Sequence, residues 1–172
     1  DSALKSSFEK RLLQLWVTRP ASYITALARS CYTDGLPWLN ELMGYLEGNA
    51  TFITEYFDQH LSDLIFLKPD ASFIGLIDAQ AIMKLIEADA AANPELYDPA
   101  KSPDGSMLSR FLGQRAKVAC NAGSWFGGEE YGSFVRFNFA TQRSRIEGAL
   151  DRIKTAIRFL VETYPQEPEQ DA

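Results

Sequence analysis

Arg136 is the residue whose type and position most directly suggest chemistry, because it lies in the middle of the apolar segment 134–139. In a β-strand, alternation places Val135, Phe137 and Phe139 on one face, where they would cover a core. Arg136 then projects from the opposite face, and a buried guanidinium without a partner is costly. The N–H donors of the planar guanidinium form a fork that matches a carboxylate through two parallel hydrogen bonds. The pattern therefore leaves three partners open for Arg136: a ligand carboxylate, an Asp or Glu of this chain, or solvent.

The rest of the sequence offers little material for a metal site or a nucleophilic active site. One histidine, His60, is too few for a zinc site or a histidine-based triad. Cys31 and Cys120 belong to no CxxC pair, so we expect free thiols in a cytoplasmic protein. No secretory signal opens the sequence and no apolar run is long enough to cross a membrane, which favours the same location. The net charge of −6 argues against a nucleic-acid partner.

The elements that position Arg136 follow from the spacing of apolar residues. Helices are expected at residues 3–17, 22–34, 37–61, 79–92 and 106–114 and from residue 144, and strands at residues 64–67, 73–78, 118–120 and 134–139. This order predicts an α+β fold, in which helices pack on a small mixed or antiparallel sheet of about three or four strands. We expect one domain, residues 1–164, with a helical linker over about 3–62, a sheet part over about 63–164 and a polar tail at 165–172.

Local signals refine these boundaries. Ser106 is a candidate N-cap, and Ser144 with Glu147 three residues later matches a capping box. Gly48 and Asn49 have low helix propensity and are expected to weaken the third helix locally.

Three further features concern loops and core. The segment 93–105 holds three prolines and is expected to be an irregular surface loop or insertion. The glycine-rich segment 123–132 is expected to be a loop, with a tight turn at the Gly-Gly pair 127–128. Trp16 and Trp38, both on expected helices, are core candidates.

Two segments around Arg136 resemble the closing signature of class I/II aminotransferases. They are most similar to the cystathionine beta-lyase branch, which belongs to the fold type I pyridoxal phosphate (PLP) enzymes. The first segment, residues 121–127, contains a Gly-x-x-Phe-Gly loop, and the second, residues 132–140, contains a strand with Val-Arg-Phe-Asn. Further segments resemble the same branch, namely residues 35–42, 45–49, 71–78 and 142–144. The similarity runs in order from about residue 20 to residue 160.

The resemblance implies that this chain is the C-terminal small domain of such an enzyme. Arg136 would then bind the α-carboxylate of an amino-acid substrate. Trp125 and Phe126 would shape the pocket for the substrate side chain, although ordinary loop packing explains them equally well. Asn121 would donate a hydrogen bond nearby, unless it serves the chemistry of the turn.

The resemblance also implies which parts lie elsewhere. PLP would be bound by a large domain outside this sequence, which supplies the Schiff-base lysine, so this chain alone is expected to be inactive. Lys5 follows the bulky Leu4, where the family has a small or hydroxyl residue, and is expected to be a solvated helix residue. The full-length enzyme is expected to be a homodimer.

Alternatives stay open at the level of function. A C–S lyase that performs β-elimination and an aminotransferase both need Arg136, although residues 35–38 and 125–127 favour the lyase branch. A non-catalytic interaction or regulatory domain is a different class of function, for which Arg136 would pair with an internal carboxylate and no concave surface would open beside it. A third alternative is an isolated fragment whose activity belongs to a longer parent. The segment 79–106 is longer than the simplest family members need, and would alter either substrate access or a partner surface.

Overall fold

The computed structural model describes residues 1–16, 21–100 and 105–165. The chain divides into two compact units, residues 1–44 and residues 45–172. Both units contribute to α3 (Leu36–His60), which crosses the division. None of the helices in the described ranges is long and apolar enough to cross a membrane.

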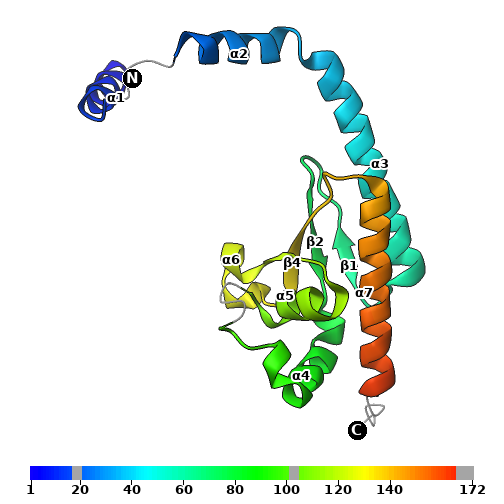
Figure 1. Cartoon of the computed structure of the whole chain (residues 1–172). Coiled ribbons are helices and arrows are strands. Elements are labelled where there is room, and N and C mark those ends of the chain that lie inside the picture. The colour runs from blue at the N-terminus through cyan, green and yellow to red at the C-terminus, as the bar shows by residue number, and fades with distance from the viewer. Residues whose placement is uncertain (17–20, 101–104, 166–172) are drawn as a thin grey trace. The chain divides into compact units, whose positions relative to one another are not determined.

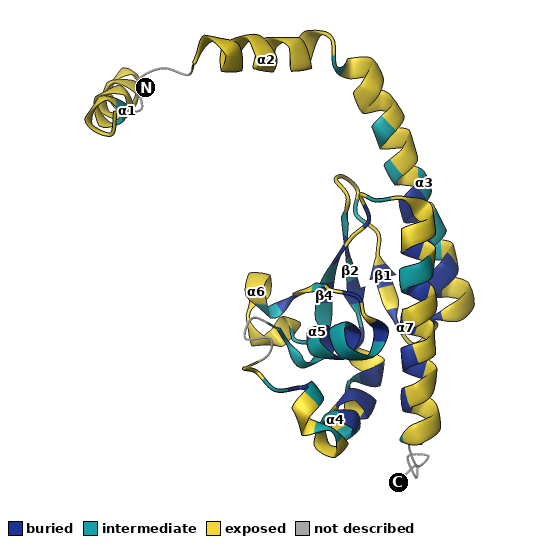
Figure 2. Ribbon diagram, viewed as in Figure 1, coloured by how far each residue is buried: buried dark blue, intermediate teal, exposed yellow. Residues whose placement is uncertain are grey.

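The first unit consists of amphipathic helices without a core of their own. It contains α1 (Ser2–Gln14), α2 (Ser22–Thr33) and the start of α3. None of its described residues is buried, and Figure 2 shows α1 and α2 almost entirely exposed. Trp16 and Trp38 were predicted as core residues, which is wrong: they are 90% and 66% exposed, because the described residues of this unit form no buried core that could cover them.

The second unit is an α+β fold built on a four-stranded antiparallel sheet (Figure 1). The strand order is β1-β2-β4-β3. The strands are β1 (Ile65–Leu67), β2 (Ile74–Asp78), β3 (Asn121–Ala122) and β4 (Phe134–Asn138). The predicted fold class is confirmed, and of the mixed and antiparallel alternatives the sheet is antiparallel.

Helices and short turns complete the second unit. The helices after α3 are α4 (Met83–Ala92), α5 (Met107–Phe111), α6 (Ser124–Gly127) and α7 (Arg143–Thr163). Single turns of 3₁₀-helix lie at Gln80–Ile82, Pro94–Leu96 and Glu129–Tyr131, and a π-helical turn lies at Leu112–Ala116. The predicted N-cap of α5 is confirmed, since Ser106 Oγ accepts a hydrogen bond from the Ser109 N–H at 3.2 Å.

One face of the sheet packs on helices and forms the core. Val135 and Phe137 of β4 are buried, as their alternation with Arg136 predicted. They join apolar residues of α3 and α7, which lie side by side and are bonded where the Tyr56 hydroxyl donates to Asp151 Oδ1 at 2.5 Å (Figure 1). The opposite face is much less covered by the described residues, and the side chain of Ile65 on it is 58% exposed.

The third strand lies three residues later than predicted. Residues 118–120 are apolar, but the Val118 N–H donates to the Leu112 carbonyl at 3.0 Å and so closes the preceding π-helical turn. Val118 therefore enters the core from a turn. Pairing with β4 begins only at Asn121, which lies opposite Arg136.

The start of α7 also differs from the prediction. Its first residue is Arg143 and its N-cap is Gln142, without a side-chain cap, so the capping box expected from Ser144 and Glu147 is wrong. The Arg143 N–H, which has no partner inside the helix, donates instead to the Tyr45 hydroxyl at 3.0 Å. A tertiary contact thus replaces the local one.

Tertiary contacts also explain the low-propensity pair in α3, which is a continuous helix. Asn49 is fully buried, and its Nδ2 donates to the carbonyls of Phe139 at 3.1 Å and Thr141 at 3.0 Å. Its Oδ1 accepts from Arg143 Nε at 3.2 Å. A Cβ at Gly48 would lie 2.7 Å from Arg143 Nη2. The pair therefore anchors the connection between β4 and α7, which offsets its low propensity.

Candidate functional site

Arg136 lies at the centre of β4, on the face opposite the core. Its partners in the sheet are Leu76 of β2 and Asn121 of β3, so it is flanked by a strand on each side. The buried neighbours Val135 and Phe137 fix the backbone of the strand from the core side. The side chain of Arg136 itself is half-buried.

The guanidinium of Arg136 makes a cation–π contact with Phe126. Its central carbon lies 4.2 Å from the centre of the ring. The described part of the chain contains no Asp or Glu that forms an ion pair with Arg136. The internal carboxylate considered from the sequence is therefore not found there, and no acidic residue of the described ranges engages the N–H donors of the Arg136 guanidinium.

A pocket of about 270 Å³ opens beside the Arg136 guanidinium. Its lining residues are Leu76, Gly123, Phe126, Gly127, Tyr131, Phe134 and Arg136. The rings of Tyr131 and Phe134 pack on each other, with centroids 5.6 Å apart. The pocket thus combines aromatic walls with a single positive charge, an arrangement suited to a ligand with a carboxylate and an apolar part.

The loop that closes this pocket folds tightly because of its glycines. The Gly123 N–H donates to the Phe134 carbonyl at 2.7 Å, and a Cβ at Gly123 would lie 2.7 Å from Phe134 Cβ. At Gly127, a Cβ would lie within 2.1–2.7 Å of three atoms of the Tyr131 ring. Gly128 has a φ of +84°, a left-handed conformation that favours glycine. The tight turn predicted at 127–128 is therefore present and holds α6 against the strand.

The structure separates the four predicted site residues into two groups. Arg136 and Phe126 line the same pocket. Trp125, by contrast, lines a neighbouring hollow of about 260 Å³, together with Asn121 and Cys120. Trp125 still touches the first group, since its ring packs edge-on against Phe126 with centroids 6.2 Å apart. Asn121 is exposed on β3, directly opposite Arg136 in register.

Cys120 is not an activated nucleophile. Cys31 and Cys120 are both free, as predicted. Burial raises the pKa of the Cys120 thiol to about 12, so it stays protonated at neutral pH. His60, at the end of α3, packs its ring edge-on against Tyr56 with centroids 4.8 Å apart. No group of three or more His, Cys, Asp or Glu within the described ranges is arranged to hold a metal ion.

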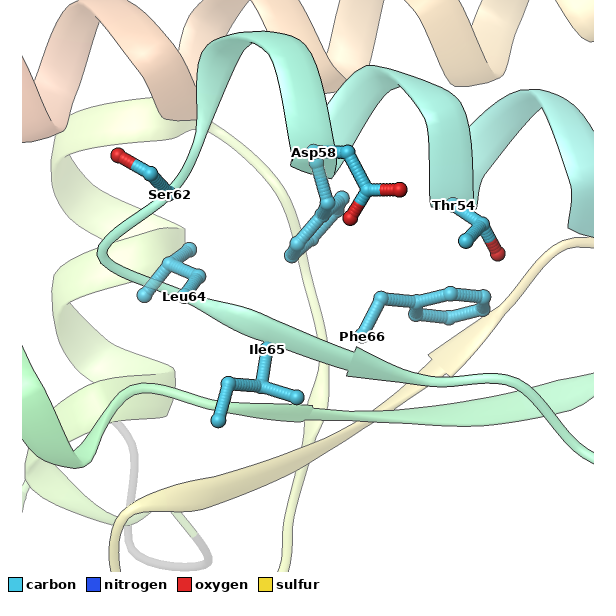
Figure 3. A pocket seen from close by; sticks show the side chains of 7 residues that line it. Thr54, Asp58, Ser62, Leu64, Ile65 and Phe66 are labelled. Carbon is cyan, nitrogen blue, oxygen red and sulfur yellow. The ribbon is translucent and has the colours of Figure 1, made fainter.

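A larger hollow, about 340 Å³, lies between the end of α3 and β1 (Figure 3). Its lining residues are Thr54, Phe57, Asp58, Ser62, Leu64, Ile65 and Phe66. The Thr54 hydroxyl is already engaged, because it donates to the Ala50 carbonyl at 3.0 Å. With no cationic residue in its lining, this hollow is less suited to a carboxylate than the pocket beside Arg136.

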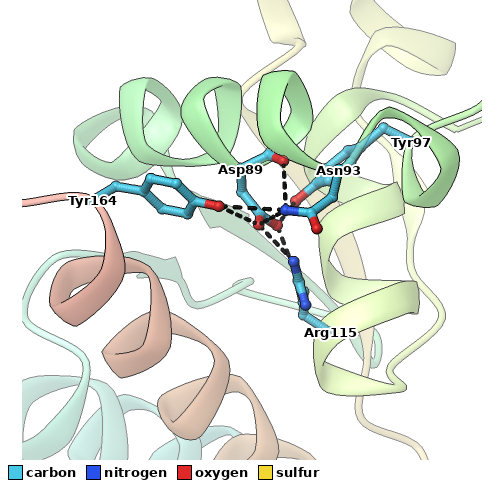
Figure 4. A network of polar contacts seen from close by, with 5 residues as sticks. All are labelled: Asp89, Asn93, Tyr97, Arg115 and Tyr164. Atoms are coloured by element: carbon cyan, nitrogen blue, oxygen red, sulfur yellow. Dashed lines mark hydrogen bonds and ion pairs between the residues drawn. The ribbon is translucent and has the colours of Figure 1, made fainter.

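Sequence reasoning missed a buried polar network around Asp89 (Figure 4). Asp89 is fully buried and accepts two hydrogen bonds from Arg115, at 2.6 and 3.0 Å. It also accepts from the Tyr97 hydroxyl at 2.5 Å, the Tyr164 hydroxyl at 3.1 Å and Asn93 Nδ2 at 2.9 Å. Burial alone would raise the pKa of Asp89, but the hydrogen bonds from Arg115 and Tyr97 outweigh it and hold the pKa below its usual value.

This network has a structural role. It joins α4, the turn at Pro94–Leu96, the π-helical turn and the end of α7, and so anchors the segment predicted as an insertion. All of its donors point at one carboxylate, which leaves little capacity for a ligand. The sequence gives no periodic signal for it, since Asp89 and Arg115 are 26 positions apart and Asp89 and Tyr164 are 75 apart.

Comparison with known proteins finds several relatives of moderate sequence identity. No protein-family model matches the sequence. Protein MalY of Escherichia coli K12 is 26% identical over 129 residues, which cover 75% of this chain and 28% of MalY. Cystathionine beta-lyase PatB of Bacillus subtilis 168 is 28% identical over 134 residues, which cover 78% of this chain and 29% of PatB.

Solved structures agree with the sequence relatives. A PLP-bound protein from Clostridium difficile 630, assigned as an aminotransferase, superimposes with a TM-score of 0.71 at 25% identity. The match covers 91% of this chain and 35% of that one. The matched part of this chain spans less than a third of the length of MalY and of PatB. It is homologous to the PLP-dependent enzymes of the MalY and cystathionine beta-lyase group and corresponds to a part of their fold.

Proposed function

We propose that this chain is the substrate-binding small domain of a PLP-dependent enzyme acting on an amino acid, and that Arg136 binds the substrate α-carboxylate. The observation that carries the proposal is the half-buried guanidinium at the centre of β4, which has no acidic partner among the described residues and lines an apolar pocket. A carboxylate entering this pocket could accept two parallel hydrogen bonds from the fork. Such a contact fixes the geometry of the bonds at the α-carbon before reaction.

The cofactor of the parent enzyme would be PLP, which when bound provides an electron sink for a carbanion at the substrate α-carbon. The described residues are not suited to holding it. The pocket beside Arg136 has no lysine in its lining. Lys5 lies on α1 with its side chain 77% exposed, 4.0 Å from Glu9. The proposal therefore assigns the cofactor and its lysine to another part of the parent protein.

The reaction would be β-elimination from a sulfur-containing amino acid or transamination. The name of PatB, a cystathionine beta-lyase, favours the first of these for a relative at 28% identity. Arg136 has the same role in both reactions. Asn121 and Trp125 would contribute from the edge of the site, through their positions opposite Arg136 and against Phe126.

The proposal requires macromolecular partners, namely the remainder of the polypeptide and a second subunit of a homodimer. Residues 1–44 support this requirement, because helices with exposed apolar side chains need a surface to cover them. Phe8, Leu27 and Leu39 are examples, each on a different helix of that unit. The match to only part of each relative agrees with a longer parent.

The alternative is a non-catalytic interaction domain that keeps the scaffold. It requires an internal carboxylate on Arg136 and no hollow beside it. The lack of an acidic partner for Arg136 among the described residues and the pocket of about 270 Å³ favour substrate binding over this alternative.

The test is Arg136→Lys in the parent enzyme, with L-cystathionine as the substrate. Lysine keeps the charge but cannot form two parallel hydrogen bonds. We expect kcat/KM to fall by roughly 10- to 100-fold, because the substitution removes about one charge-assisted hydrogen bond. Arg158→Lys is the matched control, because Arg158 is exposed on α7 and pairs only loosely with Glu162 at 3.7 Å. Unchanged kinetics of Arg136→Lys, together with turnover of the wild type, would remove Arg136 from the site and the proposal with it.

A further inference from the structure

We propose that Phe126 is a positioning residue for Arg136, which aligns the guanidinium for a carboxylate without using any of its hydrogen-bond donors. The inference rests on the proposed function, because it concerns the group that would bind the substrate carboxylate. It differs from the role expected from the resemblance, in which Phe126 contacts the substrate side chain.

The orientation of Arg136 has few other possible sources. An arginine side chain has several freely rotating bonds, and bidentate binding demands one orientation of its plane. Proteins commonly fix an arginine with an Asp or Glu, but such a partner would occupy the N–H donors that the substrate needs. Among the described residues no carboxylate plays this part, and the guanidinium instead contacts the Phe126 ring at 4.2 Å.

A ring face suits this role for a physical reason. The cation–π attraction draws a cation to the face of an aromatic ring, and when a planar guanidinium lies flat on that face its N–H groups point outward within its own plane. The guanidinium carbon lies 4.2 Å from the centre of the Phe126 ring, and a guanidinium held flat on the ring at this distance would be restrained while its N–H donors stay available to a ligand. The side chain of Arg136 is half-buried, which strengthens the contact relative to one in bulk water.

Phe126 can restrain Arg136 only if Phe126 is itself held, and the loop provides this. Phe126 lies on α6, whose start is fixed by the Gly123 N–H bonded to the Phe134 carbonyl. Its end is fixed by the close approach of Tyr131 to Gly127. The ring of Trp125 also packs edge-on against Phe126, with centroids 6.2 Å apart. The glycines of this loop thus have a structural purpose, because they allow α6 to lie close enough to β4 for the contact.

The side chain of Phe126 is 59% exposed, so its removal should disturb function far more than folding. The experiment compares Phe126→Leu and Phe126→Tyr in the PLP-loaded parent enzyme, with L-cystathionine as the substrate. We expect Phe126→Leu to raise KM by roughly 2- to 30-fold, the range allowed by the strength of a cation–π contact, with a smaller change in kcat. Phe126→Tyr should restore KM, because a phenol keeps the ring face.

Two further variants separate positioning from other roles. Phe159→Leu is the matched control, since Phe159 is also exposed and contacts an arginine, Arg115, whose central carbon lies 4.7 Å from the ring centre, and neither residue lines the pocket. Its KM should equal that of the wild type. In an Arg136→Lys background, Phe126→Leu should change KM by a smaller factor than in the wild type, because lysine has no planar fork to align.

Each outcome decides between the hypotheses. If Arg136→Lys is impaired but Phe126→Leu has wild-type KM, the positioning role is refuted and the proposed function stands. If Phe126→Leu has the same effect in both backgrounds, Phe126 acts on the substrate directly and the positioning role is again refuted. If Arg136→Lys itself is normal, the proposed function fails first. Thermal unfolding of Phe126→Leu should match the wild type, and a large loss of stability would assign the ring a structural role instead.

Discussion

The buried carboxylate of Asp89 allows a quantitative test of the packing described above. Asp89→Asn keeps the shape of the side chain but removes its charge and replaces one acceptor oxygen with a donor. The new amide would face Arg115 and the hydroxyls of Tyr97 and Tyr164, which all donate to Asp89. Arg115 would lose its only ion-pair partner among the described residues. The substitution therefore places an amide donor against the other donors at a side-chain position that is fully buried.

The size of the effect follows from burial. Breaking a buried ion pair by removing one partner costs about 3–5 kcal/mol. Arg115 keeps 24% of its side chain exposed and can recover some hydration, which places the expected loss near the lower limit, at about 3 kcal/mol. For a chain of this length, 1 kcal/mol corresponds to about 2–4 °C in Tm, so we expect Tm to fall by about 6–12 °C.

The assay is thermal and urea unfolding of the chain, followed by circular dichroism. Glu162→Gln serves as the control, because Glu162 is exposed and forms a surface pair with Arg158 that should contribute less than about 0.5 kcal/mol. A Tm of Asp89→Asn equal to that of the control would show that the network contributes little to stability, and the reasoning from burial would be wrong.

The pH dependence of stability gives an independent check with a definite sign. The folded-state pKa of Asp89 is lowered, so as the pH falls the unfolded chain binds this proton first. The stabilisation is present above the unfolded pKa of about 4 and is lost as the pH falls through the lower, folded pKa. For Tyr97 the folded pKa is raised, mainly by burial and also by its hydrogen bond to Asp89, so its contribution is lost above about pH 10. Asp89→Asn should lack the acid-sensitive part of this profile.

Three shorter tests address the sheet, the thiols and the cofactor. Gly75→Ala should destabilise the chain by about 1–3 kcal/mol in urea unfolding, because a Cβ there would lie 2.3 Å from the Phe66 ring; a neutral result would mean that the ring moves away freely. With a thiol reagent at pH 7, Cys31 should react quickly and Cys120 only on unfolding, since burial raises the pKa of Cys120 to about 12; equal rates would contradict its burial. The chain mixed with PLP should show no absorbance from a specific lysine adduct, and a stable adduct at Lys5 would refute the assignment of the cofactor to another part of the parent.

What could be predicted from the sequence is what local spacing determines. The alternation of residues 134–139 predicted the core face of β4 and the opposite face for Arg136, because a strand has a fixed period of two. The third strand was displaced because its position depends on pairing with β4, which lies more than ten residues away along the chain. The capping box at Ser144 failed for a similar reason, since the hydroxyl of Tyr45, nearly a hundred residues earlier, accepts the hydrogen bond of the first N–H of α7.

The candidate site shows the same limit at the level of single side chains. The spacing of apolar residues predicted that Arg136 would bind an anionic group. The resemblance predicted that Phe126 would line a pocket for the substrate side chain. The contact of Arg136 with Phe126 required the three-dimensional course of the loop 123–132, where Gly123 packs against Phe134 of β4 and Gly127 packs against the Tyr131 ring. A glycine kept free of a side chain by a neighbouring ring has no distinct pattern in the sequence.

The two faces of β4 divide stability from binding, and this division makes the experiments interpretable. Val135 and Phe137 are buried against helices, so changes there should alter unfolding while the pocket keeps its chemistry. Arg136 and Phe126 lie on the less covered face, where substitution removes little buried apolar area. A loss of substrate affinity without a loss of stability is therefore the signature that the proposed site must give. A core variant such as Val135→Ala should show the opposite signature, and a shared response of both faces would contradict the division.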